Sequence, residues 1–327
     1  MKICLYYKTK DKPWGGANFF ILNLKKFFIK NNITITYDIN SGYDILFLNS
    51  AYKAPGKLFK VEEISRIKNN GYTSFFRKIF AKNKERKVKI LYRVNGLRKV
   101  YANIESKMDD IQLQTIKYTD HIVFQSKFSY NLFKDFGYNG NNFSIIHNGV
   151  DQNIFNINNK VFWDKERRLK LIACSWSDNP AKGHKIIADF SCFRDIEVQF
   201  VGNWNKNIPI KNVKIFKPVS QQILANFLKQ ADIFLFPSLN ESCSNLLLEA
   251  LSCGLPVLYV DSGSNEEIAG KYGIKIDLNN LRSSLETIKL NFFSLLENII
   301  KDINKFSIDY AGRQYLEVCK EIQKWSL

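Results

Sequence analysis

The fold is decided by the stretch Pro237-Ser238-Leu239-Asn240-Glu241-Ser242-Cys243-Ser244-Asn245-Leu246-Leu247-Leu248-Glu249-Ala250. The run Asp232–Pro237 leads into it as a buried strand, a small polar loop follows, and a helix is expected from about Ser244. The first amides of such a helix have no intrahelical partner and point into the crevice beyond the strand ends, which favours phosphate binding. The alternative is that Ser244 is a plain N-cap and Glu249 a solvated helix residue.

The same alternation of strand, turn and helix continues through the whole chain, and it is typical of buried parallel strands covered by helices. Strands are expected near Lys2–Tyr7, Ile33–Tyr37, Asp44–Asn49, Lys89–Val94, His121–Gln125, Phe143–His147, Leu169–Cys174, Glu197–Val201, Val213–Phe216, Asp232–Pro237, Pro256–Val260 and Gly273–Ile276. Helices are expected at Ala17–Ile29, Ile104–Tyr118, Lys127–Phe136, Gln221–Gln230 and Asn245–Ser252. This number of strands is too large for a single doubly wound sheet. We therefore predict an α/β protein with two Rossmann-like parallel-sheet domains facing across a cleft.

The domain boundary is expected in the polar, asparagine-rich stretch Asp151–Arg168, whose composition suits a linker. This places one domain at residues 1–165 and a second at residues 166–305. A terminal helix at residues 306–327 is expected to cross back to the first domain.

Composition narrows the function further. The 327 residues contain 45% hydrophobic residues and carry a net charge of +17, which attracts phosphates, anionic lipid or nucleic acid, although a lysine- and asparagine-rich composition explains it equally well. No apolar run reaches the roughly 18 residues that span a membrane. The cysteines form no CxxC pair, which indicates buried free thiols, a reducing compartment and no zinc site. We therefore expect a cytoplasmic protein, with peripheral attachment to the inner face of a membrane as a further option.

The loop and helix from Glu241 onward resemble the signature of retaining glycosyltransferases of family four, which have the GT-B fold. Glu241 and Glu249 are separated by seven residues, and Cys253-Gly254-Leu255-Pro256-Val257 follows. The chain continues with Asp261-Ser262-Gly263-Ser264-Asn265-Glu266-Glu267-Ile268, similar to the family's glycine-containing loop before a glutamate. Further upstream, Ile145-Ile146-His147-Asn148-Gly149-Val150-Asp151 resembles the family's Asn-Gly-Val-Asp at the domain junction.

The resemblance implies a role for each matching residue. Glu241 would hold hydroxyls of the donor sugar near the reacting face, and Glu249 would bind the ribose. The backbone amides of Ser244, Asn245 and Leu246 would contact the diphosphate.

A second match is Ser175-Trp176-Ser177-Asp178-Asn179-Pro180-Ala181-Lys182-Gly183, which follows the first strand of the second domain. By resemblance, Lys182 would stabilise the leaving diphosphate; the alternative is an exposed loop lysine. Many relatives carry an arginine about five residues before this lysine, where this chain has Ser177. Arg93 is our candidate for the substitute charge.

Two segments of the first domain are candidates for ligand contacts. Trp14-Gly15-Gly16-Ala17-Asn18 lies between the first strand and the first helix, where glycines allow a close approach of backbone to a ligand, so Gly15 and Gly16 are expected at the donor phosphate. A plain turn is the alternative. Arg93 and Asn95 close a later strand of this domain and are candidate contacts to acceptor or sugar.

Basic residues concentrate in Arg77–Lys99, where ten of them accompany one acid, Glu85. Aromatic residues interleave at its start, so Phe75–Lys99 is either a patch for anionic membrane or a solvated basic loop. No nucleic-acid partner is expected, because no reading helix, zinc motif or RNP motif accompanies the charge.

Together these observations predict transfer of a sugar from a nucleotide-sugar donor to a glycan, lipid-linked or protein acceptor. The family implies retention of anomeric configuration. The donor would lie on the second domain and the acceptor on the first, and Lys182 with the helix amides would replace a divalent metal, so no cofactor is expected. The alternatives are a sugar-nucleotide epimerase, a phosphorylase, or a catalytically degraded nucleotide-sugar-binding protein.

Overall fold

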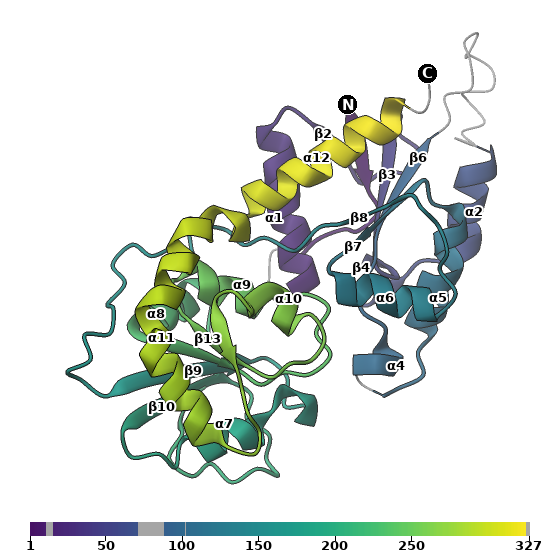
Figure 1. Ribbon diagram of the computed structural model, residues 1–327. Coiled ribbons are helices and arrows are strands. Elements are labelled where there is room, and N and C mark those ends of the chain that lie inside the picture. The colour runs from purple at the N-terminus through teal and green to yellow at the C-terminus, as the bar shows by residue number, and fades with distance from the viewer. Residues whose placement is uncertain (11–15, 71–87, 102, 325–327) are drawn as a thin grey trace. The chain divides into compact units, whose positions relative to one another are not determined.

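The computed structural model describes residues 1–10, 16–70, 88–101 and 103–324. The chain divides into two compact units (Figure 1). The first unit comprises Met1–His147 together with Ala311–Leu327, and the second comprises Asn148–Tyr310. Each unit is built around its own sheet, and the expected α/β fold with two parallel-sheet domains is confirmed.

The first unit contains a sheet whose main strands are all parallel, in the order β2-β1-β3-β6-β7-β8. These strands are β1 (Lys2–Leu5), β2 (Thr34–Thr36), β3 (Ile45–Asn49), β6 (Lys89–Arg93), β7 (His121–Phe124) and β8 (Phe143–Ile145). A small antiparallel extension, β4 (Tyr52–Ala54) with β5 (Lys57–Leu58), pairs with the end of β3. The register sets Asn49 beside Arg93, so the two polar residues meet where β3 and β6 end.

Helices surround the first sheet. They are α1 (Gly16–Lys30), α2 (Val61–Asn70), α4 (Arg98–Tyr101), α5 (Lys107–Thr115), η1 (Ile116–Tyr118), α6 (Lys127–Asp135) and, from Ala311 onward, α12 (Ile308–Lys324). Ser106 and Ser126 cap α5 and α6 with their hydroxyl oxygens. The ring of Tyr315 on α12 is fully buried, with its centroid 5.8 Å from the rings of both Phe20 and Phe47.

The second unit contains a fully parallel sheet in the order β11-β10-β9-β12-β13-β14. Its strands are β9 (Leu169–Ser175), β10 (Ile196–Gly202), β11 (Lys214–Phe216), β12 (Ile233–Phe236), β13 (Val257–Tyr259) and β14 (Gly273–Lys275). Its helices are η2 (Pro180–Lys182), α7 (His184–Phe190), α8 (Gln221–Gln230), α9 (Asn245–Ser252), α10 (Asn265–Ala269), α11 (Leu281–Asp302) and η3 (Ile303–Phe306).

Strand alternation gives this second sheet a core on each face. Ile172 and Phe234 belong to the cluster that includes residues of α8 and α9, whereas Leu171 and Ile233 belong to the cluster that includes residues of α7 and α11. Both faces of the central strands are therefore apolar, which is why their sequence reads as continuous hydrophobic runs.

The stretch expected to link the domains packs with the second unit. We expected the boundary at residue 165, but residues 148–165 belong to the second unit. Phe155 is buried in one of its cores and Trp163 in the other, where its ring lies 5.4 Å from that of Phe292. Isolated aromatic anchors between asparagines thus hold a segment whose composition resembles a linker.

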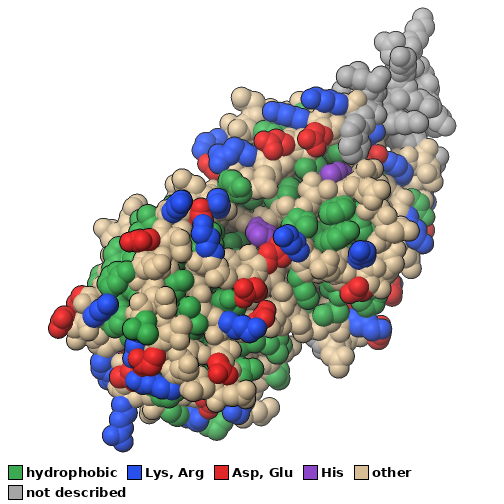
Figure 2. All heavy atoms as spheres, in the orientation of Figure 1, with side chains coloured by type: hydrophobic (Ala, Val, Ile, Leu, Met, Phe, Trp, Pro, Cys, Tyr) green, Lys and Arg blue, Asp and Glu red, His purple; other side chains and the backbone are tan. Residues whose placement is uncertain are grey.

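Surface charge is mixed on the face drawn in Figure 2, where Asp and Glu side chains lie among the Lys and Arg side chains. The basic segment Phe75–Lys99 falls mostly outside the described residues. In the described ranges, no helix has the length and apolar character needed to cross a membrane. Of the cysteines, all are free thiols, and only Cys192 is exposed.

Candidate functional site in the second unit

The candidate site lies at the carboxyl edge of the second sheet, where the loops after β9, β12 and β13 meet. Parallel strands end at the same edge, so segments far apart in the sequence come together there. The loop after β9 carries Lys182, the loop after β12 carries Glu241, and the loop after β13 carries Gly263.

Lys182 ends a short turn that is docked onto the neighbouring loop. Asn179 caps this turn, with its side-chain oxygen accepting a hydrogen bond from the Ala181 amide at 2.8 Å. The Leu239 amide donates to the Ala181 carbonyl at 2.8 Å. Gly183 follows with a φ of +70°, and a Cβ there would lie 2.6 Å from the Pro237 side chain, so only glycine fits without a shift.

Glu241 lies on the loop after β12, in contact with Lys182. Its carboxylate forms an ion pair with the Lys182 ammonium through Oε1 and Nζ. Its carbonyl accepts a hydrogen bond from the Ser264 amide at 2.8 Å. The structure therefore brings together the two residues that the sequence predicts to be catalytic.

Helix α9 begins directly after the Glu241 loop. Ser244 is its N-cap residue, in an extended conformation with φ −75° and ψ 124°, and its side chain makes no capping hydrogen bond. The amides of Asn245 and Leu246 lie in the first turn of this helix, where the backbone has no intrahelical acceptor for them. The predicted diphosphate contacts Ser244, Asn245 and Leu246 thus lie at the helix terminus next to Glu241.

Asn148 fixes the approach to α9, a role that the sequence prediction missed. Its side-chain amide donates to the Cys243 carbonyl at 3.1 Å and to the Asn245 side-chain oxygen at 2.9 Å. Its backbone amide donates to the Cys243 sulfur at 3.2 Å. The Asn-Gly pair at positions 148 and 149 was the available signal, but a turn motif gives no indication of its distant partner.

Glu249 lies about one turn into α9 and is buried. Burial raises the pKa of its carboxyl from 4.5 to about 7, because the charged form loses its hydration. Its polar partner is the side-chain amide of Gln221, which donates to Oε1 over a long 3.5 Å. The prediction that Glu249 could be a solvated helix residue is thereby wrong.

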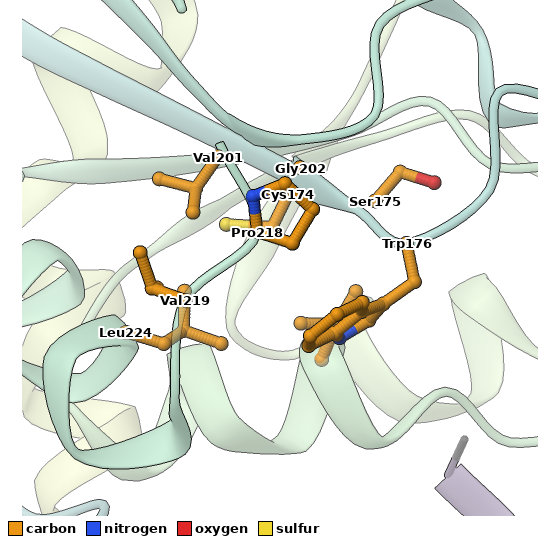
Figure 3. Close-up of a pocket in the computed structure, with 9 residues that line it drawn as sticks. Cys174, Ser175, Trp176, Val201, Gly202, Pro218, Val219 and Leu224 are labelled. Carbon is orange, nitrogen blue, oxygen red and sulfur yellow. The ribbon is translucent and has the colours of Figure 1, made fainter. Parts of the chain in front are cut away.

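A small pocket opens beside α9, at the ends of β9 and β10 (Figure 3). Its cavity volume is small, about 10 Å³, which is room for about one water molecule. Its lining is mostly apolar and consists of Cys174, Ser175, Trp176, Val201, Gly202, Pro218, Val219, Leu224 and Leu246. Burial raises the pKa of the Cys174 thiol, and the nearby Glu249 carboxylate raises it further, which places this acid close to the pocket.

Trp176 is a second residue that the sequence prediction did not assign to the site. Figure 3 shows its side chain on one side of the pocket and Val219 and Leu224 on the other. Trp176 is 51% exposed, unusual for a residue with so large an apolar side chain. Its backbone carbonyl accepts a hydrogen bond from the Asn203 side chain at 2.7 Å. The available signal was a tryptophan directly after a buried strand.

The candidate ligand contacts of the first unit are Gly15, Gly16, Arg93 and Asn95. Gly15 lies outside the described residues, and Gly16 is the first residue of α1. Arg93 is buried, donating from Nη1 to the side-chain oxygens of Asn49 at 2.7 Å and Asn95 at 3.0 Å, and from Nη2 to Gln125 at 2.7 Å. Its guanidinium is therefore tied into an amide network at the end of its own sheet, and a contact with acceptor or diphosphate stays a prediction.

Ser177, which stands where many relatives have an arginine, takes part in a local turn. Its carbonyl accepts a hydrogen bond from the Ser175 hydroxyl at 2.6 Å, and its own hydroxyl accepts from the Asn179 amide at 3.2 Å. Among the described residues, no group of three or more His, Cys, Asp or Glu side chains is placed to hold a metal ion.

Residues 185–289 match the family Glycosyl transferases group 1. The MMP alpha-(1->4)-mannosyltransferase of Mycolicibacterium hassiacum is 29% identical over 133 residues, which cover 36% of this chain and 32% of that protein. The chain thus matches about a third of the length of this curated relative.

Solved structures match over nearly the whole chain. Sucrose-phosphate synthase from Thermosynechococcus elongatus has a TM-score of 0.68 at 12% identity, with 98% of both chains covered. Anabaena HepE in complex with UDP and glucose has a TM-score of 0.66 at 14% identity, covering 98% of this chain and all (100%) of that one. At such identities the likeness concerns the fold. The chain therefore has the GT-B fold, and its residues 185–289 are similar to the family Glycosyl transferases group 1.

Proposed function

We propose that this chain is a glycosyltransferase that uses a nucleotide-sugar donor. The observation that carries the proposal is the convergence of Lys182, Glu241 and the amino terminus of α9 at one sheet edge, beside an apolar pocket and the buried Glu249. A cation, the amides at a helix amino terminus and a carboxylate next to an apolar slot match the successive parts of a nucleotide sugar.

Each part of the donor has a counterpart in this arrangement. We assign the flat base to the exposed Trp176 side chain beside this pocket, and the ribose hydroxyls to Glu249. The diphosphate is held by the Lys182 ammonium and the first amides of α9, because a helix amino terminus attracts anions. The transferred sugar then lies at Glu241. The crystal structure of HepE with UDP and glucose gives a precedent for such a ligand in this fold.

We further propose that transfer retains the anomeric configuration and needs no divalent metal. Retention rests on the resemblance of the Glu241 to Glu249 segment to family four. Metal independence rests on the positive charge already present, since Lys182 and the helix amides can neutralise the departing diphosphate. The protein's contribution is then positioning and electrostatic stabilisation.

The acceptor is assigned to the first unit by the same resemblance. A glycan, a lipid-linked sugar or a protein are the acceptor classes that we propose, and the mannosyltransferase named above is one relative whose name specifies a sugar transfer. Contact of Phe75–Lys99 with an anionic membrane and a cytoplasmic location are further proposals. Vesicle co-sedimentation with and without anionic lipid tests the membrane contact.

A thermal-shift screen of UDP, GDP and their sugar conjugates tests the donor site, because a ligand that binds the folded state raises its stability. We expect one base to stabilise the protein, and a screen without any stabilising nucleotide would contradict the proposal. Product analysis with that donor, with and without EDTA, then tests transfer, anomeric outcome and metal independence. Loss of transfer under chelation would reject the metal-free mechanism alone.

The presence of Ser177 favours one alternative, a nucleotide-sugar-binding protein that has lost catalysis. Without an arginine at this position, the leaving group has one positive charge fewer than in many relatives. Donor binding without any acceptor-dependent release of nucleotide would support this alternative. Conversion of the donor in the absence of acceptor would instead indicate an epimerase, and release of a sugar 1-phosphate from a glycan by inorganic phosphate would indicate a phosphorylase.

A further inference from the structure

The ion pair between Lys182 and Glu241 joins the two groups that the proposed function assigns to different parts of the donor. The Lys182 side chain is 29% exposed and that of Glu241 23% exposed, so both are within reach of a ligand from solvent. The ammonium expected to hold a diphosphate is therefore paired with a carboxylate of the same site.

The backbones on both sides of this pair are fixed. The Lys182 turn is held through Ala181 and Gly183 against the loop after β12, and the Glu241 backbone is held by Ser264. Any rearrangement on ligand binding must therefore be a rotation of the two side chains. Each is long enough to change partner without movement of the loops.

A diphosphate and the Glu241 carboxylate compete for the same ammonium, and they repel each other when both lie beside it. From this competition we infer that the pair works as an exchange device that discriminates the donor from the nucleoside diphosphate product. The inference rests on the proposed function, and it assigns to Glu241 a second role in product release.

The exchange has different consequences for the two ligands. With the complete donor, Lys182 moves to the diphosphate, and the sugar hydroxyls donate hydrogen bonds to the released Glu241 carboxylate. With the nucleoside diphosphate alone, Lys182 moves likewise, but Glu241 loses its partner beside an anion and gains no hydroxyl. The product is therefore bound more weakly than the diphosphate contacts alone would allow, which favours its release.

Calorimetric titration of the full chain with a nucleoside diphosphate and its sugar conjugate, UDP with UDP-glucose or GDP with GDP-mannose, tests the inference. In Glu241→Gln we expect the nucleoside diphosphate to bind roughly two- to fivefold more tightly, because a competing, partly exposed ion pair is removed. The sugar conjugate should bind about tenfold more weakly, because a charge-assisted hydrogen bond is lost.

Asp261→Asn is the matched control for the change in net charge. Asp261 follows β13 and pairs with Lys275 at 2.6 Å, so its neutralisation leaves the Lys182 pair intact. We expect it to alter both affinities by less than about twofold, since exposed pairs contribute little. Thermal unfolding of each variant establishes that it is folded.

Two results would overturn the inference: unchanged or weaker binding of the nucleoside diphosphate to Glu241→Gln, or equal tightening in Asp261→Asn. Failure of the proposed function has a different signature, because the wild-type protein would then bind neither ligand. Opposite changes for the two ligands cannot arise from a merely structural role of Glu241, which would weaken both.

Discussion

Gly263 lies against the backbone of Glu241 so closely that a Cβ would be 2.5 Å from the Glu241 carbonyl oxygen and 2.6 Å from its amide nitrogen. Its φ of +63° also belongs to the left-handed region that side chains disfavour. The glycine loop after β13 thus serves as the support on which the Glu241 loop rests. Precise placement of a reacting group needs such support from behind.

This contact predicts that Gly263→Ala displaces Glu241. We expect donor turnover to fall at least tenfold, because misplacement of about 1 Å is costly for a positioned group. Gly56→Ala is the matched control: Gly56 has a φ of +77° but no atom within 4 Å of its Cβ position. Both variants should lose about 1 kcal/mol of stability through the backbone conformation, and equal turnover in the two would contradict the supporting role.

Lys182→Ala should reduce the rate of transfer by about a hundredfold or more, as removal of one preorganised charge stabiliser typically does. The measurement is steady-state turnover with the donor found by the thermal-shift screen. Lys185→Ala provides the control, because Lys185 lies three residues further, has a side chain that is 78% exposed and pairs with Asp189. A comparable loss in both variants would indicate a general effect of positive charge and reject the specific role of Lys182.

The order of strands and helices was predictable because nearly every core strand is buried on both faces. Hydrophobic runs such as Leu169–Cys174 leave no alternative to a parallel sheet, and their bounds agree closely with the structure. The hairpin of β4 and β5 was missed, because its short strands are only partly buried and lack a hydrophobic run. The expected helix at Ile104–Tyr118 begins later, at Lys107, because Ser106 caps it.

The candidate site was predictable to the extent that its residues lie in one local motif. Glu241, Ser244 and Glu249 share a loop and a helix, so spacing alone relates them. The role of Asn148 could not be predicted, because its partners Cys243 and Asn245 lie 95 and 97 residues further along the chain. The raised pKa of Glu249 was equally hidden, since burial depends on tertiary packing rather than on sequence neighbours.

Trp176→Ala should weaken binding of the nucleoside diphosphate roughly tenfold or more, because stacking of a base on an aromatic ring contributes about 1–3 kcal/mol. Trp176→Phe retains an aromatic face and should bind nearly as well as the wild type. Calorimetric titration with the nucleoside diphosphate checks this in all three proteins. Any quenching of tryptophan fluorescence that the nucleotide causes through Trp176 in the wild type should be absent in Trp176→Phe. Inorganic pyrophosphate, which has no base, should bind equally to all three proteins. Unchanged nucleotide affinity in Trp176→Ala would remove the indole from the site.

The buried Glu249 carboxyl makes the stability of the protein fall as pH rises. Its pKa is raised from 4.5 to about 7 in the folded state, so folding favours the protonated form and stability falls as pH rises between these values. Glu249→Gln, which is neutral at every pH, should therefore change the free energy of unfolding little at about pH 5 and increase it by about 1–3 kcal/mol at about pH 8. Urea unfolding at both pH values measures this, with Glu297→Gln as the control at an exposed glutamate of α11. An equal effect of Glu249→Gln at both pH values would mean that the buried carboxyl does not change its charge in this range.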